Sequence, residues 1–128
     1  MNKRILLIED NEQNRYLVTF LLQARGWEVT HAADGPSGLT LAAEIVPALI
    51  LLDIQLPGMD GYAVAEALRA NQQLDAIPVV AVTSYAMPGD RERCIKAGCN
   101  GYLEKPIDPE TFATDVEQFM KPVSRCAS

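Results

Sequence analysis

The sequence predicts an α/β protein built on a doubly wound, five-stranded parallel sheet. Short continuous runs of Ile, Leu and Val, typical of strands buried on both faces, alternate with segments whose apolar residues have helical spacing. The alternation occurs five times in 128 residues, which is the usual length of one domain with its own core. Strands that alternate with helices form right-handed crossovers, which produce a parallel sheet covered on both faces.

Five segments are expected to be strands. Three are continuous apolar runs, whereas the second in chain order has only partial alternation and the fifth is short. The expected strands are Ile5–Ile8, Trp27–His31, Ala48–Leu52, Val79–Val82 and Gly101–Leu103. The flavodoxin-like strand order 2-1-3-4-5 is the natural solution for this succession of elements.

Helices are expected in each of the intervals that follow these strands. The first is expected over Glu12–Arg25, with Gly26 as its stop, and the second lies between Pro36 and Pro47. The third follows Gly61.

The last two helices are predicted from weaker patterns. The stretch Pro88–Ala97 has a thin apolar stripe of Cys94, Ile95 and Ala97 among charged residues. In the final helix, Asp108 is the expected N-cap and Pro109 the first helical residue. The domain is expected to span residues 1–121, with 122–128 as a short flexible tail.

Composition excludes several functional classes. A net charge of −6 argues against nucleic-acid binding and against docking on an anionic membrane. No apolar run approaches the roughly 20 residues that span a bilayer, and no signal peptide is present, so we expect a cytoplasmic protein. Its cysteines, Cys94, Cys99 and Cys126, are odd in number without CxxC spacing, which favours free thiols.

Polar side chains follow four of the expected strands. Glu9 and Asp10 follow the first, Asp53 the third, Thr83 the fourth, and Lys105 the fifth. The carboxyl ends of parallel strands meet at one edge of a sheet, where ligands bind. Clustered carboxylates repel one another, and a hard cation such as Mg²⁺ neutralises them while leaving positions for phosphoryl oxygens. The set therefore suits a phosphoryl group, with one aspartate as nucleophile.

These motifs together resemble the receiver domain of bacterial two-component response regulators. The resemblance covers Lys3 to Met120 and depends on four linked motifs rather than on one. The motifs are Ile8-Glu9-Asp10-Asn11, Leu52-Asp53-Ile54-Gln55-Leu56-Pro57-Gly58-Met59-Asp60-Gly61, Ala81-Val82-Thr83-Ser84 and Gly101-Tyr102-Leu103-Glu104-Lys105-Pro106.

The resemblance implies a role for each matching position in the site. Asp53 is the implied phosphoacceptor, and Mg²⁺ or Mn²⁺ the implied cofactor. The implied metal ligands are Asp53, Asp10, Glu9 through water, and the backbone carbonyl of Gln55. Lys105 is implied to pair with the phosphoryl group.

The resemblance also implies a switch and its partners. Thr83 moves to the phosphoryl group, Tyr102 swings inward, and the bond before Pro106 is cis. The phosphoryl group would come from a sensor histidine kinase or a His-phosphotransfer protein, with specificity residing on Glu12–Arg25. The downstream protein would bind the face formed by residues 88–97, 101–103 and 109–120. Such a protein is a signalling switch rather than an enzyme.

Several alternatives remain at this point. The chain could be a stand-alone regulator or a receiver from a hybrid histidine kinase, and it could be a receiver-fold interaction module that works without phosphorylation. A haloacid-dehalogenase-type phosphatase needs a second acid at the position of Gln55. A flavin or nucleotide binder needs a glycine-rich phosphate loop, and neither GxGxxG nor GxxxxGK[ST] is present.

Overall fold

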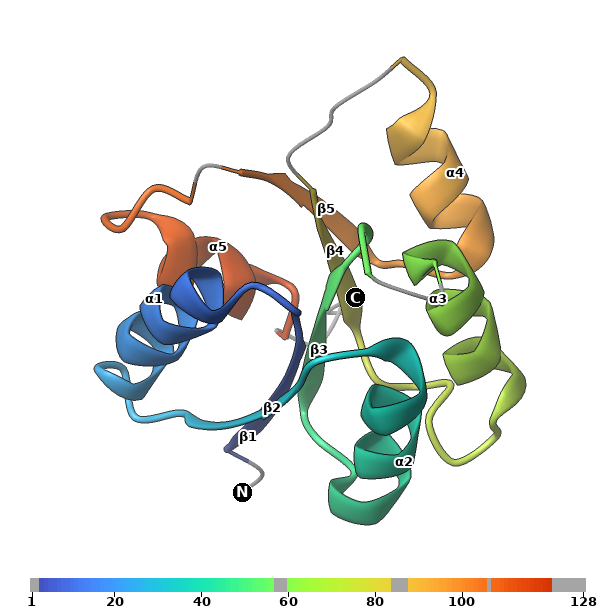
Figure 1. The fold of residues 1–128 in the computed structure, drawn as a ribbon, viewed down its shortest axis with the longest axis horizontal. Coiled ribbons are helices and arrows are strands. Elements are labelled where there is room, and N and C mark those ends of the chain that lie inside the picture. The colour runs from blue at the N-terminus through green and yellow to red at the C-terminus, as the bar shows by residue number, and fades with distance from the viewer. Residues whose placement is uncertain (1–2, 57–59, 84–87, 106, 121–128) are drawn as a thin grey trace, which may run out of the picture.

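The five apolar runs form one parallel sheet in the order β2-β1-β3-β4-β5, which confirms the predicted topology. Figure 1 shows the computed structural model, which describes residues 3–56, 60–83, 88–105 and 107–120. The strands are β1 (Arg4–Ile8), β2 (Glu28–Ala32), β3 (Leu49–Asp53), β4 (Val79–Thr83) and β5 (Gly101–Glu104).

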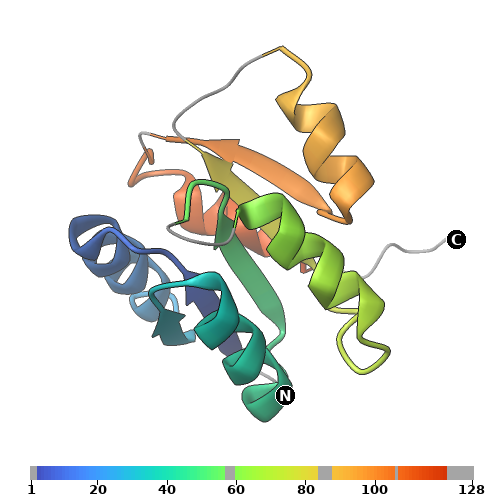
Figure 2. The same cartoon turned by 45° about the vertical axis from the view of Figure 1, so that its right-hand side comes forward.

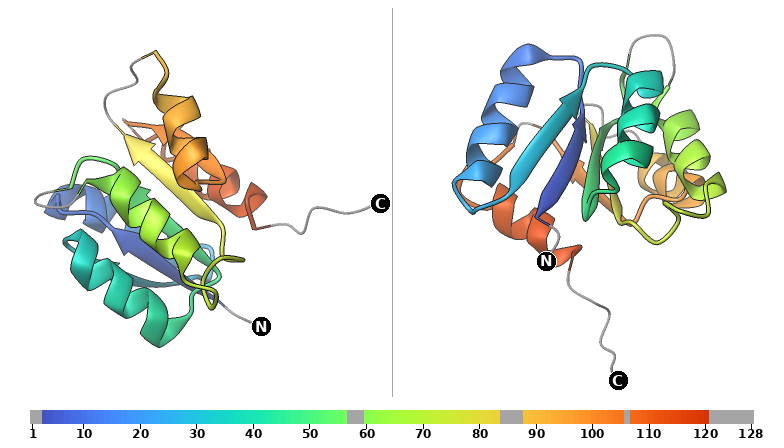
Figure 3. Two further views of the ribbon diagram at one scale, coloured as in Figure 1. Left: turned by 90° about the vertical axis from the view of Figure 1, so that its right-hand side faces the viewer. Right: turned by 90° about the horizontal axis from the view of Figure 1, so that it is seen from below.

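Helices cover both faces of this sheet. One face carries α1 and α5, and the other carries α2, α3 and α4, as Figures 1 and 3 show. The helices are α1 (Glu12–Gln23), α2 (Gly35–Ile45), α3 (Gly61–Ala70), α4 (Asp90–Ala97) and α5 (Phe112–Gln118).

Strict alternation along the strands divides the apolar side chains between two cores. In β1, Leu6 and Ile8 face α2 and α3, whereas Ile5 and Leu7 face α1 and α5. Both sets are almost completely buried, which is why the central strands are continuous apolar runs rather than alternating ones. The cores therefore fix the register of the sheet, because a shift by one residue would exchange the two faces.

The observed boundaries differ from the expected ones where polar residues end an element. Asp53 and Thr83 are the last residues of β3 and β4 rather than the first residues after them. Helix α4 begins at Asp90, with Gly89 as its N-cap, so Pro88 lies outside the helix.

The prediction for the start of the last helix was wrong. Thr111 is the N-cap of α5, and Asp108 instead closes the preceding turn, because its side chain accepts from the Glu110 amide and its carbonyl from the Phe112 amide. The helix ends at Gln118.

The remaining expectations divide between described and undescribed residues. Cys94 and Cys99 are buried free thiols, as predicted, whereas Cys126 lies outside the described residues. Pro106 and the proposed tail 122–128 lie outside them as well. Among the described helices, none combines the length and hydrophobicity needed to cross a bilayer.

Candidate functional site

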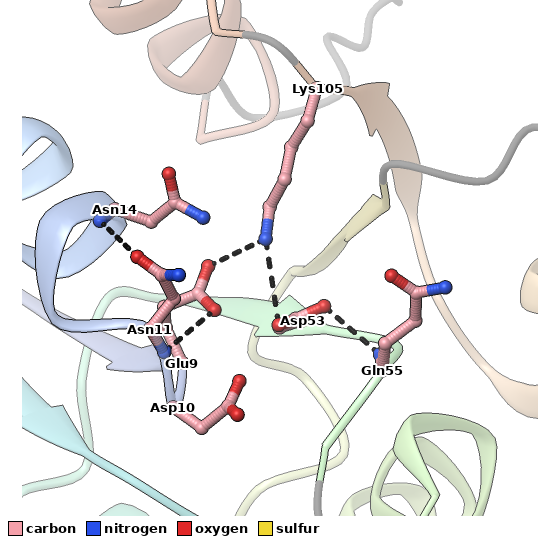
Figure 4. A pocket seen from close by; sticks show the side chains of 7 residues that line it. All are labelled: Glu9, Asp10, Asn11, Asn14, Asp53, Gln55 and Lys105. Atoms are coloured by element: carbon pink, nitrogen blue, oxygen red, sulfur yellow. Dashed lines mark hydrogen bonds and ion pairs between the residues drawn. The ribbon is translucent and has the colours of Figure 1, made fainter.

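The carboxyl edge of the sheet brings the predicted acids and the predicted lysine into one pocket, shown in Figure 4. The loop after β1, the end of β3 and the residue after β5 all contribute to it. The described residues that line it are Glu9, Asp10, Asn11, Asn14, Asp53, Gln55 and Lys105.

Three carboxylates form the acidic part of the pocket. One carboxylate oxygen from each of Glu9, Asp10 and Asp53 lies within 4.8 Å of the other two. Glu9 and Asp53 are buried, whereas Asp10 is exposed. An all-oxygen set that is open to solvent on one side matches the preference of Mg²⁺ for carboxylates and retained water. The residues present therefore fit a divalent cation.

Lys105 is the cation that faces these acids within the described site. Its ammonium group lies 2.8 Å from Glu9 Oε1 and 3.5 Å from Asp53 Oδ2. Burial, followed by a side-chain hydrogen bond with Asp53, raises the pKa of Glu9 to about 7 despite the nearby ammonium. The positive charge of one lysine therefore does not balance the negative charge of the clustered carboxylates.

Backbone contacts hold Asp53 and the residues after it against the sheet. The Gln55 amide donates to Asp53 Oδ1 at 2.9 Å, and the Ile54 amide donates to the Val82 carbonyl at 3.1 Å. The other Asp53 oxygen, Oδ2, faces Lys105. The Gln55 side chain is exposed at the pocket rim.

A glycine lets the next helix begin directly against this strand end. The Gly61 amide donates to the Ile54 carbonyl at 3.0 Å, and a Cβ on Gly61 would lie 2.5 Å from Ile54 Cα. The start of α3 therefore packs on the backbone next to Asp53, and the Asp60 side chain caps it by accepting from the Ala63 amide.

Two of the three predicted switch residues, Thr83 and Tyr102, are not among the described residues that line the pocket. Thr83 is buried at the end of β4, and its carbonyl accepts from the Lys105 amide at 2.8 Å. Tyr102 is half-buried on β5 and packs against the core on the α3 and α4 side. Pro106 is outside the described residues.

Sequence reasoning gave no role to two asparagines that line the pocket. Asn11 caps α1 by accepting from the Asn14 amide at 2.9 Å, and its own amide donates to Glu9 Oε2 at 3.3 Å. An Asn directly before a helix is a recognisable N-cap signal, so Asn11 could have been found. The position of Asn14 at the rim follows only from the direction in which α1 leaves the sheet.

The sequence is similar over nearly its whole length to a response regulator. The chain is 41% identical over 120 residues to the polar-differentiation response regulator DivK of Brucella ovis, covering 94% of this chain and 98% of that protein.

Solved structures agree with this relationship. Chemotaxis protein CheY4 of Vibrio cholerae superposes with a TM-score of 0.88 at 28% identity, covering 93% of this chain and 99% of that one. The receiver domain of sensor histidine kinase PA1611 from Pseudomonas aeruginosa PAO1, solved with magnesium coordinated in its active-site cleft, has a TM-score of 0.85 at 34% identity. The match covers 94% of this chain and 98% of that domain.

The family model of the response regulator receiver domain matches residues 5–117, which include all three carboxylates and Lys105. Receiver domains are signalling proteins of two-component systems. On the fold, the site and these matches, the chain belongs to the response regulator receiver domain family.

Proposed function

We propose that this protein is a phosphorylation-dependent switch that accepts a phosphoryl group on Asp53. The observation that carries the proposal is the convergence of three carboxylates and one lysine in an open pocket at the strand ends. Asp53 is the proposed nucleophile because it ends β3, is buried, is held by the Gln55 amide, and directs its other oxygen toward Lys105.

The transfer step joins an Asp53 carboxylate oxygen to phosphorus. The phosphorus–nitrogen bond of a phosphohistidine on the donor breaks as the new oxygen–phosphorus bond forms. The electron pair of the broken bond stays on the leaving imidazole, which takes up a proton. Since Oδ1 accepts a hydrogen bond from the Gln55 amide, Oδ2 is the oxygen that faces the pocket and attacks.

A divalent cation, Mg²⁺ or Mn²⁺, would be held by Asp10, Asp53, the Gln55 carbonyl, and Glu9 through water. When bound, the cation neutralises the carboxylates and the charge of the phosphoryl oxygens. The magnesium in the related receiver of PA1611 supports this assignment. The acidic cluster of this chain has the oxygen donors that such an ion prefers.

Lys105 and Thr83 would contact the phosphoryl group once it is attached to Asp53. The Lys105 ammonium is already within 3.5 Å of Asp53 Oδ2, so it can pair with a phosphoryl oxygen attached there. Thr83 would contribute its hydroxyl, and Tyr102 would turn inward in response. Pro106, which follows Lys105, completes this proposed switch.

The donor would be a sensor histidine kinase or a His-phosphotransfer protein that docks on α1. Tyr16 and Phe20, on successive turns of α1, are 75% and 61% exposed, which is unusual for aromatic side chains. The start of α1 also forms one wall of the pocket through Asn11 and Asn14. A protein that covers the pocket mouth would therefore contact the start of α1.

The signal would leave through a different face. A downstream protein would bind the surface formed by residues 88–97, 101–103 and 109–120, which belongs to α4, β5 and the region of α5. We further propose that residues 1–121 form the receiver domain and that it acts in the cytoplasm, with neither nucleic acid nor membrane as a partner. Its phosphoryl chemistry modifies only itself.

The experiment that tests this function is intact-protein mass spectrometry after incubation with Mg²⁺ and acetyl phosphate. Wild-type protein should gain one phosphoryl group, whereas Asp53→Asn and a wild-type sample containing EDTA should gain none. Thr40→Val, a change of an exposed helix hydroxyl, is the matched control and should gain one phosphoryl group. A wild-type protein without an adduct would favour an interaction module that works without phosphorylation.

A further inference from the structure

Two buried cysteines lie at the end of α4. Cys94, in the last turn of the helix, is 1% exposed, and Cys99, which comes shortly before β5, is 5% exposed. Both belong to the core on the α2, α3 and α4 side of the sheet, and Figure 2 shows the chain turning back there from α4 into β5. Ile95 is instead 55% exposed, although its place in the apolar stripe predicted a packed side chain.

The backbone of this turn brings the two cysteines together. The Cys99 amide donates to the Cys94 carbonyl at 2.9 Å, and the Gly98 amide donates to the Ile95 carbonyl at 3.0 Å. Gly98 has a φ of +111°, which lets the chain reverse at this point. The two bonds form a Schellman motif, in which the residues joined by the longer-range bond commonly make an apolar side-chain contact. Here both residues at that contact are cysteines.

The side chains of the pair also interact with each other. Burial is the main cause that raises the pKa of both thiols, and it raises that of Cys99 to about 12. A side-chain hydrogen bond between Cys94 and Cys99 contributes to the pKa of each. The Tyr62 side chain, at the start of α3, forms a further hydrogen bond with Cys94. Both cysteines are therefore held as thiols in mutual contact.

The residues on either side of Cys99 are anchored by Arg69, from the last turn of α3. Arg69 Nε donates to the Gly98 carbonyl at 2.6 Å, and Nη2 donates to Asn100 Oδ1 at 2.5 Å. The Asn100 amide also donates to the Val79 carbonyl at 2.6 Å, which joins this segment to the start of β4. The position of Cys99 opposite the end of α4 is therefore fixed from both sides.

We propose that Cys94 and Cys99 form a reversible disulfide, which makes the end of α4 a site of redox modification. A single buried cysteine acts as a small apolar residue, but two in contact can be joined. A disulfide has narrow geometric requirements, so it forms most readily where the backbone already holds the two residues close together. The direct hydrogen bond between their main chains meets that requirement. The bond lies in the core against which Tyr102 packs.

A low-molecular-weight disulfide such as glutathione disulfide is the oxidant. The thiolate of one cysteine attacks a glutathione sulfur, so that a mixed disulfide forms while the glutathione disulfide bond breaks and one glutathione leaves. The thiolate of the second cysteine then attacks the protein sulfur of the mixed disulfide, which forms the Cys94–Cys99 bond and releases the second glutathione. The two protons lost by the protein thiols pass to the two glutathione thiolates. Because burial disfavours the thiolates, this exchange is slow, and its equilibrium is the quantity to measure.

The test equilibrates the full chain at low concentration with mixtures of reduced and oxidised glutathione, then quenches with acid and records intact mass. Cys126→Ser is the reference protein, because Cys126 lies outside the described residues and its removal leaves only the pair. The oxidised form should be lighter by two hydrogen atoms. Trypsin cleaves after Arg93 and Lys96, so two peptides joined across Lys96 identify the bond. The equilibrium constant for the disulfide should be roughly tenfold or more larger in the folded protein than in urea.

Two controls complete the test. Cys99→Ser in the Cys126→Ser background keeps one thiol and should show no loss of two hydrogen atoms. Asp53→Asn in the same background should form the disulfide to the same extent as the reference, which separates this proposal from phosphorylation. Wild-type protein should give the same joined peptides. A smaller ratio between folded and unfolded protein, or a glutathione adduct without the joined peptides, would overturn the proposal, because it would show that the fold resists the bond.

Discussion

The two ends of the sheet each hold a glutamate in a charged cluster, and the two clusters are built in opposite ways. At the carboxyl end, Glu9 lies among other carboxylates with one lysine. At the amino end, Glu117 of α5 accepts from the Arg25 guanidinium and from Trp27 Nε1, the latter at 2.9 Å. Lys3 adds a second cation there, with its ammonium 5.3 Å from the Trp27 ring centroid.

The pKa values of the two glutamates express this difference. Burial and the neighbouring carboxylate raise the pKa of Glu9 to about 7. The hydrogen bond from Arg25 lowers the pKa of Glu117, and the bond from Trp27 adds to the effect. The amino end is electrostatically satisfied by its own residues, whereas the carboxyl end has an excess of negative charge that a cation would offset. Both ends contain charged residues, but only the carboxyl end has carboxylate charge that its neighbouring cation does not balance.

The largest expected effect tests how tightly the functional end is packed. Gly61→Ala should destabilise the fold by roughly 3 kcal/mol, because its Cβ would meet the backbone of Ile54, which cannot move without displacing Asp53. In Gly38→Ala, the Cβ would instead meet the tip of the Ile8 side chain, and the better helix propensity of alanine offsets part of that cost. In urea unfolding, the free energy of unfolding of Gly61→Ala should therefore be well below that of Gly38→Ala. Equal losses of stability in the two variants would contradict a rigid strand end.

The next effect comes from the cation that the proposed site would bind. This prediction depends on the proposed metal site. Mg²⁺ at 100 times its Kd should raise the free energy of unfolding, measured in urea, by about 2.7 kcal/mol. Asp10→Asn should reduce this gain at the same Mg²⁺ concentration, whereas Glu117→Gln should keep it. If both variants kept the full gain, Mg²⁺ would be acting elsewhere than on the acidic cluster.

A smaller effect is expected at the amino end. Glu117→Gln should cost about 1 kcal/mol, because Trp27 keeps an acceptor but the charge that favours its hydrogen bond is lost. The pH dependence follows from the lowered pKa of Glu117. Its stabilising contribution is complete above the ordinary value of 4.5 and is lost as the pH falls through the lower folded value.

Wild-type protein should therefore lose the stabilisation from ionised Glu117 as the pH falls below 4.5. Glu117→Gln should not show this decrease in stability. Glu44→Gln, a change of an exposed glutamate on α2, is the matched control and should behave like wild type. Parallel stability curves for wild type and Glu117→Gln from pH 6 to pH 3 would show that the amino-end cluster is not what stabilises the fold.

The two ends also differ in how well the sequence predicts them. The site at the carboxyl end was predictable because Asp53 follows directly on an apolar run and Asp10 and Lys105 come one residue after the end of one, and parallel strands bring such positions together. The Arg25–Glu117 pair joins the turn after α1 to α5, 92 positions apart, and no local pattern marks either residue. The same is true of Arg69, whose contacts at Gly98 and Asn100 depend on how α3 and α4 pack.

Two predictions about individual helices failed, one about where a helix starts and one about which side chain is buried. Asp108 and Pro109 have the composition of a helix start, but the chain makes a separate turn there before α5 begins. Ile95 fits the helical period of α4, yet α4 packs too far out for that face to be covered. Periodicity predicts which residues share a face of a helix, and only packing decides which face is buried.

The smallest effect concerns backbone strain, and it shows that strain is not what marks the functional end. Val46 is the C-cap of α2, at the amino end, and has φ of +44°, a conformation that β-branched residues rarely adopt. Val46→Gly should stabilise the protein by about 0.5–1 kcal/mol, since relief of the strain exceeds the added freedom of the unfolded chain. Val46→Ala should gain less, because it keeps the Cβ that crowds the backbone. Thermal unfolding would measure both gains, and the phosphoryl adduct on Asp53 should form at the wild-type rate in each variant. A gain in stability without a change at Asp53 would confirm that strain at this end is incidental, whereas a changed rate would mean that α2 is coupled to the site.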